Sequence, residues 1–225
     1  MELEEIRALR RALHSCPEQS GQETRTRAML MDFLGARTEL ELHPCGAGFY
    51  AARREPGGTK PPIALRADYD ALALPGGGAA HLCGHDGHAA ALCGTILSLK
   101  GERLDRDVFF LFQPAEETGA GAPGCLELFE RERVARIYGA HNLPGYPLGQ
   151  VFTRPGTFAC ASRGVTLAFQ GRPTHAAYPE HGLSPATAVG RLLCALPQLA
   201  RAERYGGMTL CTVIGAELGE RAFGT

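Results

Sequence analysis

The chain has 225 residues, of which 23 are basic and 24 acidic, and its formal net charge is −1. This length suits one large domain or two modest ones. The balanced charge and the lack of a Lys/Arg-rich run argue against nucleic acid binding, and no apolar stretch is long enough to span a bilayer. The charged, amphipathic first residues are unlike a secretion signal, so we expect a soluble, cytoplasmic protein that binds neither nucleic acid nor membrane.

The first third of the chain contains patterns for two helices and a hairpin. Apolar residues at helical spacing predict a helix over 2–15. A capping box from Ser20 to Glu23 predicts the start of a second helix. Alternating residues then predict a strand over 38–43, and residues 48–53 follow a Pro/Gly turn as its hairpin partner.

The middle of the chain alternates short apolar runs with helical patterns. Strands are predicted over 62–68, 107–112 and 135–140, and helices over 89–99 and 125–133. This alternation predicts an α/β layer with a largely parallel sheet. Polar clusters follow all three strands: "RADYD", "QPAEE" and "HNLP". Because chemistry in such sheets gathers at the carboxyl ends of strands, we expect these clusters to form one site.

After residue 150 the sequence predicts a strand over 163–171, a helix over 183–203 and a strand over 208–218. These elements make half of a second α+β unit, which is too small for an independent domain. We therefore expect a catalytic α/β domain over 1–158 and an incomplete second domain over 159–225. We also expect the chain to be a piece of a longer protein.

The string "HLCGHDGH" at 81–88 is the densest group of metal-ligand types in the chain. Cys83 and His85 can converge if they lie on a loop that enters a helix, and a thiolate with an imidazole suits zinc, manganese, cobalt or nickel. The alternative is that Asp86 caps the following helix and the histidines are solvated. We expect His81 and His88 to support the loop. The eight cysteines include no C-x-x-C pair, and we expect most to be buried thiols.

The three strand-end clusters each allow two interpretations. Asp68 and Asp70 could orient ligand histidines or form a solvated turn. Of Glu116 and Glu117, one could bind a metal while the other takes a proton from water, or both could lie at an exposed helix start. His141 is a ligand if its strand-end position is significant, and a structural histidine otherwise.

Together, and in this order, these motifs resemble the amidohydrolase branch of the family-20 metallopeptidases, which includes aminoacylases, hippurate hydrolases and auxin-conjugate hydrolases. The strings that carry the resemblance are "LHSCPEQSGQE", "LRADYDAL", "HLCGHDGHAA", "FQPAEETGAGA", "GAHNLPGYPLG" and "GRPTHAAYP". The resemblance implies a zinc-peptidase-like α/β catalytic domain with part of a smaller α+β, ferredoxin-like lid and dimerisation domain.

The resemblance also implies a two-metal site and a reaction. Two divalent ions (Zn, Mn, Co or Ni) would be held by Cys83, His85, Glu117 and His141. Glu116 would be the general base, Asp70 would prop the site, and His175 of the lid would reach across a homodimer to polarise the scissile carbonyl. The substrate would be an N-acyl amino acid or a small peptide, hydrolysed at its amide bond.

Two departures from the family pattern leave alternatives open. The connection "PGGGAA" before the histidine-rich string is shorter than usual, and the family's last ligand histidine would lie beyond Thr225. One alternative is therefore a non-catalytic metal-binding or dimerising protein of the same fold. Another is a hydrolase that uses Cys83 as its nucleophile with His85 as the base.

Overall fold

A computed structural model describes residues 2–219. Contacts within the chain divide it into two units, Met1–Gln150 and Val151–Thr225, where the sequence predicted a boundary after residue 158. Among the described residues, no helix combines the length and the apolar character needed to cross a membrane.

The first unit is built on a five-stranded mixed sheet in the order β1-β2-β6-β3-β7. The strands are β1 (Glu41–Cys45), β2 (Gly48–Arg53), β3 (Ile63–Asp68), β6 (Val108–Gln113) and β7 (Arg136–Gly139). Strand β2 pairs antiparallel with β1 and β6, whereas β3 pairs parallel with β6 and β7. The predicted hairpin and the three predicted strands that follow it are thus present, although β7 is exposed along its length, and the parallel half is the half that ends in the polar clusters.

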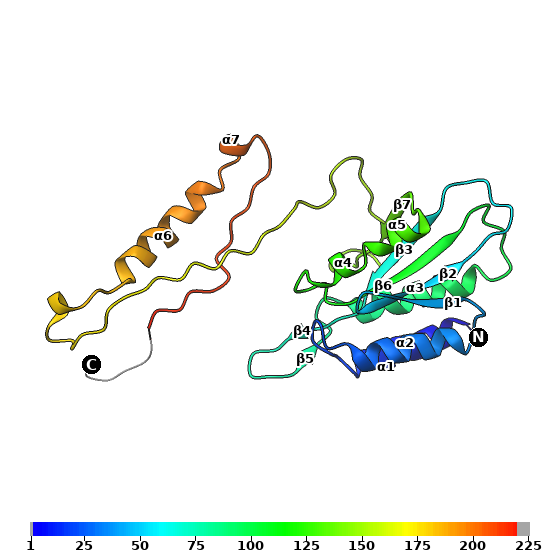
Figure 1. Ribbon diagram of the computed structural model, residues 1–225, viewed down its shortest axis with the longest axis horizontal. Coiled ribbons are helices and arrows are strands. Elements are labelled where there is room, and N and C mark those ends of the chain that lie inside the picture. Colours follow the sequence, from blue (N-terminus) through cyan, green and yellow to red (C-terminus); the bar gives the residue numbers. More distant parts are fainter. Residues whose placement is uncertain (1, 220–225) are drawn as a thin grey trace. The chain divides into compact units, whose positions relative to one another are not determined.

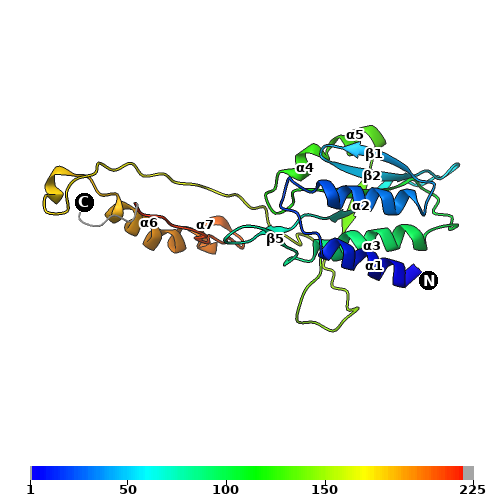
Figure 2. The same ribbon diagram turned by 90° about the horizontal axis from the view of Figure 1, so that it is seen from below.

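Helices cover both faces of the sheet (Figure 1, Figure 2). On one face lie α1 (Glu2–His14), α2 (Thr24–Gly35) and α3 (His85–Ser98), and on the other lie α4 (Gly121–Gly124) and α5 (Glu127–Glu132). A short hairpin of β4 (Leu72–Ala73) and β5 (Ala79–Ala80) follows β3. The α/β class predicted from the sequence is confirmed.

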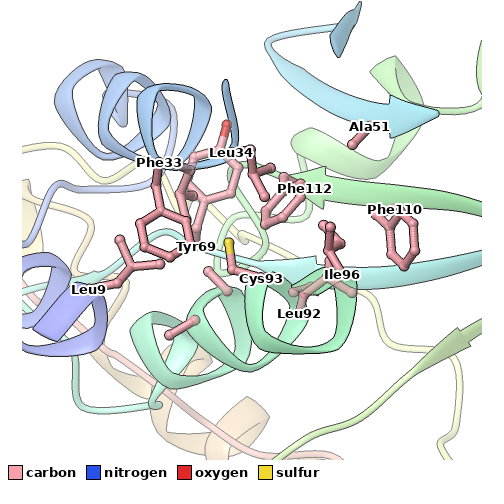
Figure 3. Packing of buried hydrophobic residues seen from close by; sticks show 14 of the residues in the cluster. Leu9, Phe33, Leu34, Ala51, Tyr69, Leu92, Cys93, Ile96, Phe110 and Phe112 are labelled. Carbon is pink, nitrogen blue, oxygen red and sulfur yellow. The ribbon is translucent and has the colours of Figure 1, made fainter. Parts of the chain in front are cut away.

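Strand β6 shows why the sheet is covered on both sides. All six of its residues are buried. Phe110 and Phe112 pack with the α1, α2 and α3 residues, as Figure 3 shows, while Phe109 and Leu111 pack with Leu128 of α5. Successive side chains of a strand point to opposite faces, so a strand that is apolar at every position requires an apolar layer on each side.

The start of α2 differs from the predicted capping box. Ser20 and Glu23 do not bond each other's backbone: the Ser20 hydroxyl donates to Asp70 Oδ2, and Glu23 Oε1 accepts from the backbone N–H groups of Gly21 and Ala115. The helix is capped instead by Glu18, whose carboxylate accepts the N–H of Arg25 and that of Thr26. A carboxylate there also opposes the positive end of the helix dipole.

In the second unit the described residues form helices but no ladder of strands. They are the 3₁₀ turn η1 (Pro179–His181), α6 (Ala186–Leu199) and α7 (Ala202–Tyr205). The strands predicted over 163–171 and 208–218 are absent from the described structure. A strand needs a neighbouring strand to satisfy its backbone groups, and the pairing recorded in this part is a single bridge between Arg172 and Leu183.

Candidate metal centre

The polar clusters that follow β3, β6 and β7 meet at one edge of the sheet, because the three strands are adjacent and parallel. Asp70 follows β3, Glu116 and Glu117 follow β6, and His141 follows β7. The amino end of α3 brings His85 to the same edge. Residues far apart in the sequence therefore converge here through the sheet topology.

His85 lies at the centre of the group and is fully buried. Its Nδ1 donates to Asp70 Oδ1 at 2.8 Å. Its Nε2 lies 3.7 Å from Glu117 Oε1 and 3.9 Å from Glu116 Oε2. Both His85 Nε2 and Glu117 Oε1 are buried and have no hydrogen-bond partner, which is rare for buried polar atoms. A cation between them would satisfy both.

Cys83 and His141 extend this group on a more open side. Cys83 Sγ lies 3.4 Å from His141 Nε2, and His141 Nδ1 bonds the carbonyl oxygen of Asn142 at 2.8 Å. With Nδ1 carrying the proton, Nε2 presents a lone pair toward the sulfur. Potential ligand atoms of Cys83, His85 and His141 lie within 4.8 Å of one another, as do those of His85, Glu116 and Glu117. A third such group joins His85 to Asp68 and His88, so His85 belongs to all three.

The ionisation of Cys83 depends on its surroundings. Burial raises the pKa of the thiol to about 11, and the nearby charge of Glu117 adds to this shift. For His85, burial lowers the pKa, but the hydrogen bond from the imidazole to Asp70 raises it above its usual value overall. Without a cation the Cys83 thiol therefore holds its proton, and a bound cation would displace it.

Asp70 holds three parts of the site in place. Its Oδ2 accepts the Ser20 hydroxyl at 2.5 Å and the Glu117 backbone N–H at 3.0 Å, while its Oδ1 accepts His85. Burial alone would raise the pKa of Asp70, but the hydrogen bonds, that of His85 first, lower it. The carboxylate thus stays charged and sets the orientation of the His85 ring.

A second carboxylate, Asp68, anchors the neighbouring histidine. His88 Nδ1 lies 2.7 Å from Asp68 Oδ1, and Arg66 Nη1 lies 2.6 Å from Oδ2. Burial opposes ionisation, but these two partners lower the pKa of Asp68 to about 2. The backbone N–H of Asn142 donates to His88 Nε2 at 3.1 Å. His88 therefore links β3 to the segment after β7, which agrees with a supporting role.

The alternative in which Asp86 caps α3 is wrong. The residue before the helix is Gly84, in a left-handed conformation at φ 91°, and no side chain caps the helix. Asp86 is instead fully buried and bonds His14 Nδ1 at 2.8 Å and Arg10 Nε at 3.1 Å, both on α1. It attaches α3 to α1. A side chain at Gly84 would meet the Asn142 amide at 2.8 Å.

His175, the remaining predicted site residue, belongs to the second unit. Its side chain is exposed, and its Nδ1 accepts the backbone N–H of Ala177 at 3.1 Å. Ser20 and Asn142 are two participants that sequence reasoning missed. The sequence pattern indicated a helix-capping role for Ser20, and the only signal for Asn142 was that it follows His141.

The donor set agrees with a family match. The model of peptidase family M20/M25/M40 matches residues 64–218 of this chain. The chain belongs to this family. An M20 crystal structure from Bacillus subtilis, described as a dinuclear metal-binding peptidase, is 37% identical, with a TM-score of 0.59 over 64% of this chain and 44% of that one.

The curated relatives that this chain matches have hydrolytic names. An N-acetyldiaminopimelate deacetylase of Exiguobacterium sibiricum is 32% identical over 202 residues, which are 84% of this chain and 54% of the relative. An N-acetylcysteine deacetylase of Bacillus subtilis is 34% identical over 84% of this chain and 53% of its own length. An IAA-amino acid hydrolase of Arabidopsis thaliana is 31% identical over 87% and 47%. The M20 chain described here spans about half the length of these relatives.

Proposed function

We propose that this M20 chain carries a metal-dependent amidohydrolase centre, which hydrolyses the amide bond of N-acyl amino acids or small peptides. The observation that carries the proposal is the buried His85, whose Nε2 faces the oxygens of Glu116 and Glu117 without a hydrogen-bond partner. The named relatives, two deacetylases and an amino acid hydrolase, support this substrate class.

The proposed metal ligands are Cys83, His85, Glu117 and His141. Their sulfur, nitrogen and oxygen donors suit zinc, cobalt, nickel or manganese, and sulfur favours the softer of these ions. Two ions are proposed because an M20 relative is described as a dinuclear metal-binding peptidase; the groups of potential ligand atoms around His85 agree with metal binding at this position. Divalent ions at such a centre polarise an amide carbonyl and lower the pKa of water.

Glu116 is the proposed general base. Its side chain is 41% exposed, against 21% for Glu117, so of the two carboxylates that face His85 it is the one more accessible to water. Glu116 would take a proton from the attacking water and pass it to the leaving nitrogen. Asp70 would act through His85, because its carboxylate fixes the ring with Nε2 toward the centre.

The second unit has a proposed role that rests on the family resemblance. Residues 1–158 would be the catalytic domain, and residues 159–225 would contribute to a lid through which two subunits pair. His175 would enter the site of the other subunit and polarise the substrate carbonyl. Its exposed imidazole is compatible with contact to a substrate. The cytoplasmic location stays a prediction from the sequence.

The test is hydrolysis of N-acetyl and N-benzoyl amino acids after addition of Mn²⁺, Zn²⁺ or Co²⁺, measured as release of the free amino acid. We expect metal-dependent turnover that Glu116→Gln reduces by at least about 100-fold, the lower range for general base catalysis. Glu130→Gln, a change of an exposed carboxylate on α5, is the matched control and should retain full activity. Turnover that is equal in Glu116→Gln would contradict the proposal.

The two alternatives give different results in the same assay. A non-catalytic metal-binding protein would bind the ions without turnover. A cysteine-nucleophile hydrolase would keep its activity in a chelator. The geometry speaks against the second, because Cys83 Sγ contacts His141 rather than His85 as its hydrogen-bond partner. The pKa of its thiol is also raised, to about 11, whereas the thiol of an activated cysteine nucleophile has a lowered pKa.

A further inference from the structure

Two buried cysteines meet on the side of the sheet that faces α4 and α5. Cys45 is the last residue of β1, and Cys125 lies between α4 and α5. They are 80 positions apart in the sequence. Their exposed fractions are 0% and 2%, and both belong to the apolar cluster around Leu128 rather than to the metal centre.

The contacts between the two cysteines are reciprocal. Cys45 Sγ lies 3.5 Å from the Cys125 carbonyl oxygen, and Cys125 Sγ lies 3.6 Å from the Cys45 carbonyl oxygen. The backbones next to them are also in contact, because a Cβ on Gly46 would lie 2.7 Å from the Gly124 carbonyl oxygen. Each thiol therefore donates a hydrogen bond across the junction to the carbonyl of the other residue, so the two side chains lie close together, as a disulfide would need.

Other cysteines lack such a partner. Within the described residues, no second pair of cysteines is in hydrogen-bond contact; Cys83 contacts His141 instead. Cys93 is buried among the apolar residues of the opposite face. The simpler interpretation is that Cys45 and Cys125 are reduced cysteines that only fill space in the apolar cluster. That interpretation explains their burial and their thiol-to-carbonyl hydrogen bonds, and it predicts that both cysteines stay alkylatable after mild oxidation.

We propose that Cys45 and Cys125 are a disulfide-forming pair, oxidised by hydrogen peroxide or an alkyl hydroperoxide. The Cys45 thiolate attacks a peroxide oxygen, so that an S–O bond forms and the O–O bond breaks; the departing hydroxide or alkoxide takes up the proton that the Cys45 thiol released, and water or an alcohol leaves. Cys125 then attacks the Cys45 sulfur: the S–S bond forms, the S–O bond breaks, and the thiol proton leaves with the hydroxide as water. The two sulfurs lose two electrons, and the peroxide gains them.

The electrostatics of the pair indicate which sulfur attacks first. A hydrogen bond from the Cys125 side chain lowers the pKa of Cys45, although burial acts in the opposite direction. The same contact raises the pKa of Cys125, and burial adds to it. Cys45 is therefore the better thiolate and Cys125 the resolving thiol.

The cross-link would join the β1–β2 hairpin to the segment that follows Glu117. It would close a loop of about 80 residues and so restrict the unfolded chain. For a protein of this size we expect the melting temperature to rise by roughly 5 °C or more after oxidation. This inference does not depend on the proposed hydrolytic function.

The experiment is peptide mapping of the full chain after mild treatment with hydrogen peroxide. Free thiols are alkylated under denaturing conditions, and the protein is digested without reductant and analysed by mass spectrometry. We expect a linked peptide that contains Cys45 and Cys125, which a reductant separates. The melting temperature should rise on oxidation and return on reduction.

Three variants complete the test. Cys45→Ala and Cys125→Ser should lose the linked peptide and the reversible rise in melting temperature. Cys93→Ala, which changes a buried cysteine of the opposite face, should retain both. Peroxide treatment that leaves Cys45 and Cys125 alkylatable while other cysteines are oxidised would overturn the proposal in the wild-type chain, whether or not the variants fold.

Discussion

The substitution Asp70→Asn tests how the centre is held together. The Asp70 side chain is 0% exposed and accepts hydrogen bonds from Ser20, His85 and the Glu117 backbone. Asparagine has nearly the same shape, but it offers one carbonyl oxygen and turns an NH₂ group toward a donor. At least one of the three bonds is therefore lost, and the negative charge beside the imidazole disappears.

The magnitude follows from the bonds lost. A hydrogen bond to a charged group contributes about 1.5–3 kcal/mol, so we expect the free energy of unfolding to fall by about 2 kcal/mol. Removal of a carboxylate that orients a ligand histidine weakens metal affinity by about 10- to 100-fold, or about 1.4–2.8 kcal/mol.

The assay is calorimetric titration of the metal-free protein with Zn²⁺, together with urea unfolding. Asp105→Asn is the matched control, because Asp105 bonds Thr59 and Lys60 away from the centre and should leave zinc affinity unchanged. If folded Asp70→Asn bound zinc as tightly as the wild type, the assigned role of Asp70 in positioning His85 would be refuted.

Two further predictions concern the α5 side of the sheet. Leu128→Ala should lower the free energy of unfolding by about 2–5 kcal/mol, because Leu128 is fully buried. The control Leu126→Ala changes a side chain that is 61% exposed and should alter the free energy of unfolding by less than about 0.5 kcal/mol. Urea unfolding measures both values. Burial raises the pKa of Glu132, but the bonds of its carboxylate to Arg54 and Tyr50 lower the pKa overall. The ionised carboxylate therefore stabilises the fold at pH values above its pKa in the unfolded chain, near 4.5. This contribution to the free energy of unfolding should disappear as the pH falls below that value and through the lower pKa of the folded chain. Glu132→Gln should flatten that dependence in unfolding curves between about pH 3 and 7, and an unchanged slope would contradict the assignment.

Much of the first unit could be predicted from the sequence because its signals are local. The all-apolar β6 indicates a strand buried on both faces, and the alternation of strands with helices indicates a parallel arrangement. The convergence of Asp70, Glu116 and His141 follows from one topological rule, that the carboxyl ends of adjacent parallel strands lie together. Periodicity and topology were sufficient there.

Other features could not be predicted because they depend on partners distant in the sequence. Ser20 and Glu23 fit a capping box locally, but Asp70 and the Ala115 backbone compete for them in the folded chain. Asp86 fits a helix cap, yet α1 supplies His14 as its partner. In the second unit, the segments with a strand-like pattern do not form strands in the described residues. An alternation of apolar and polar residues indicates which side of a strand would be buried, but it does not identify the neighbouring strand with which that strand must pair.

The central claim is that Cys83, His85, Glu117 and His141 share a centre for divalent ions. Cobalt binding tests it directly, because a thiolate ligand gives Co²⁺ a sulfur-to-metal charge-transfer absorption. We predict this absorption in the wild-type chain, its retention in Cys93→Ser and its loss in Cys83→Ser. Absorption that survived Cys83→Ser, or a wild-type chain that bound no cobalt, would contradict the account.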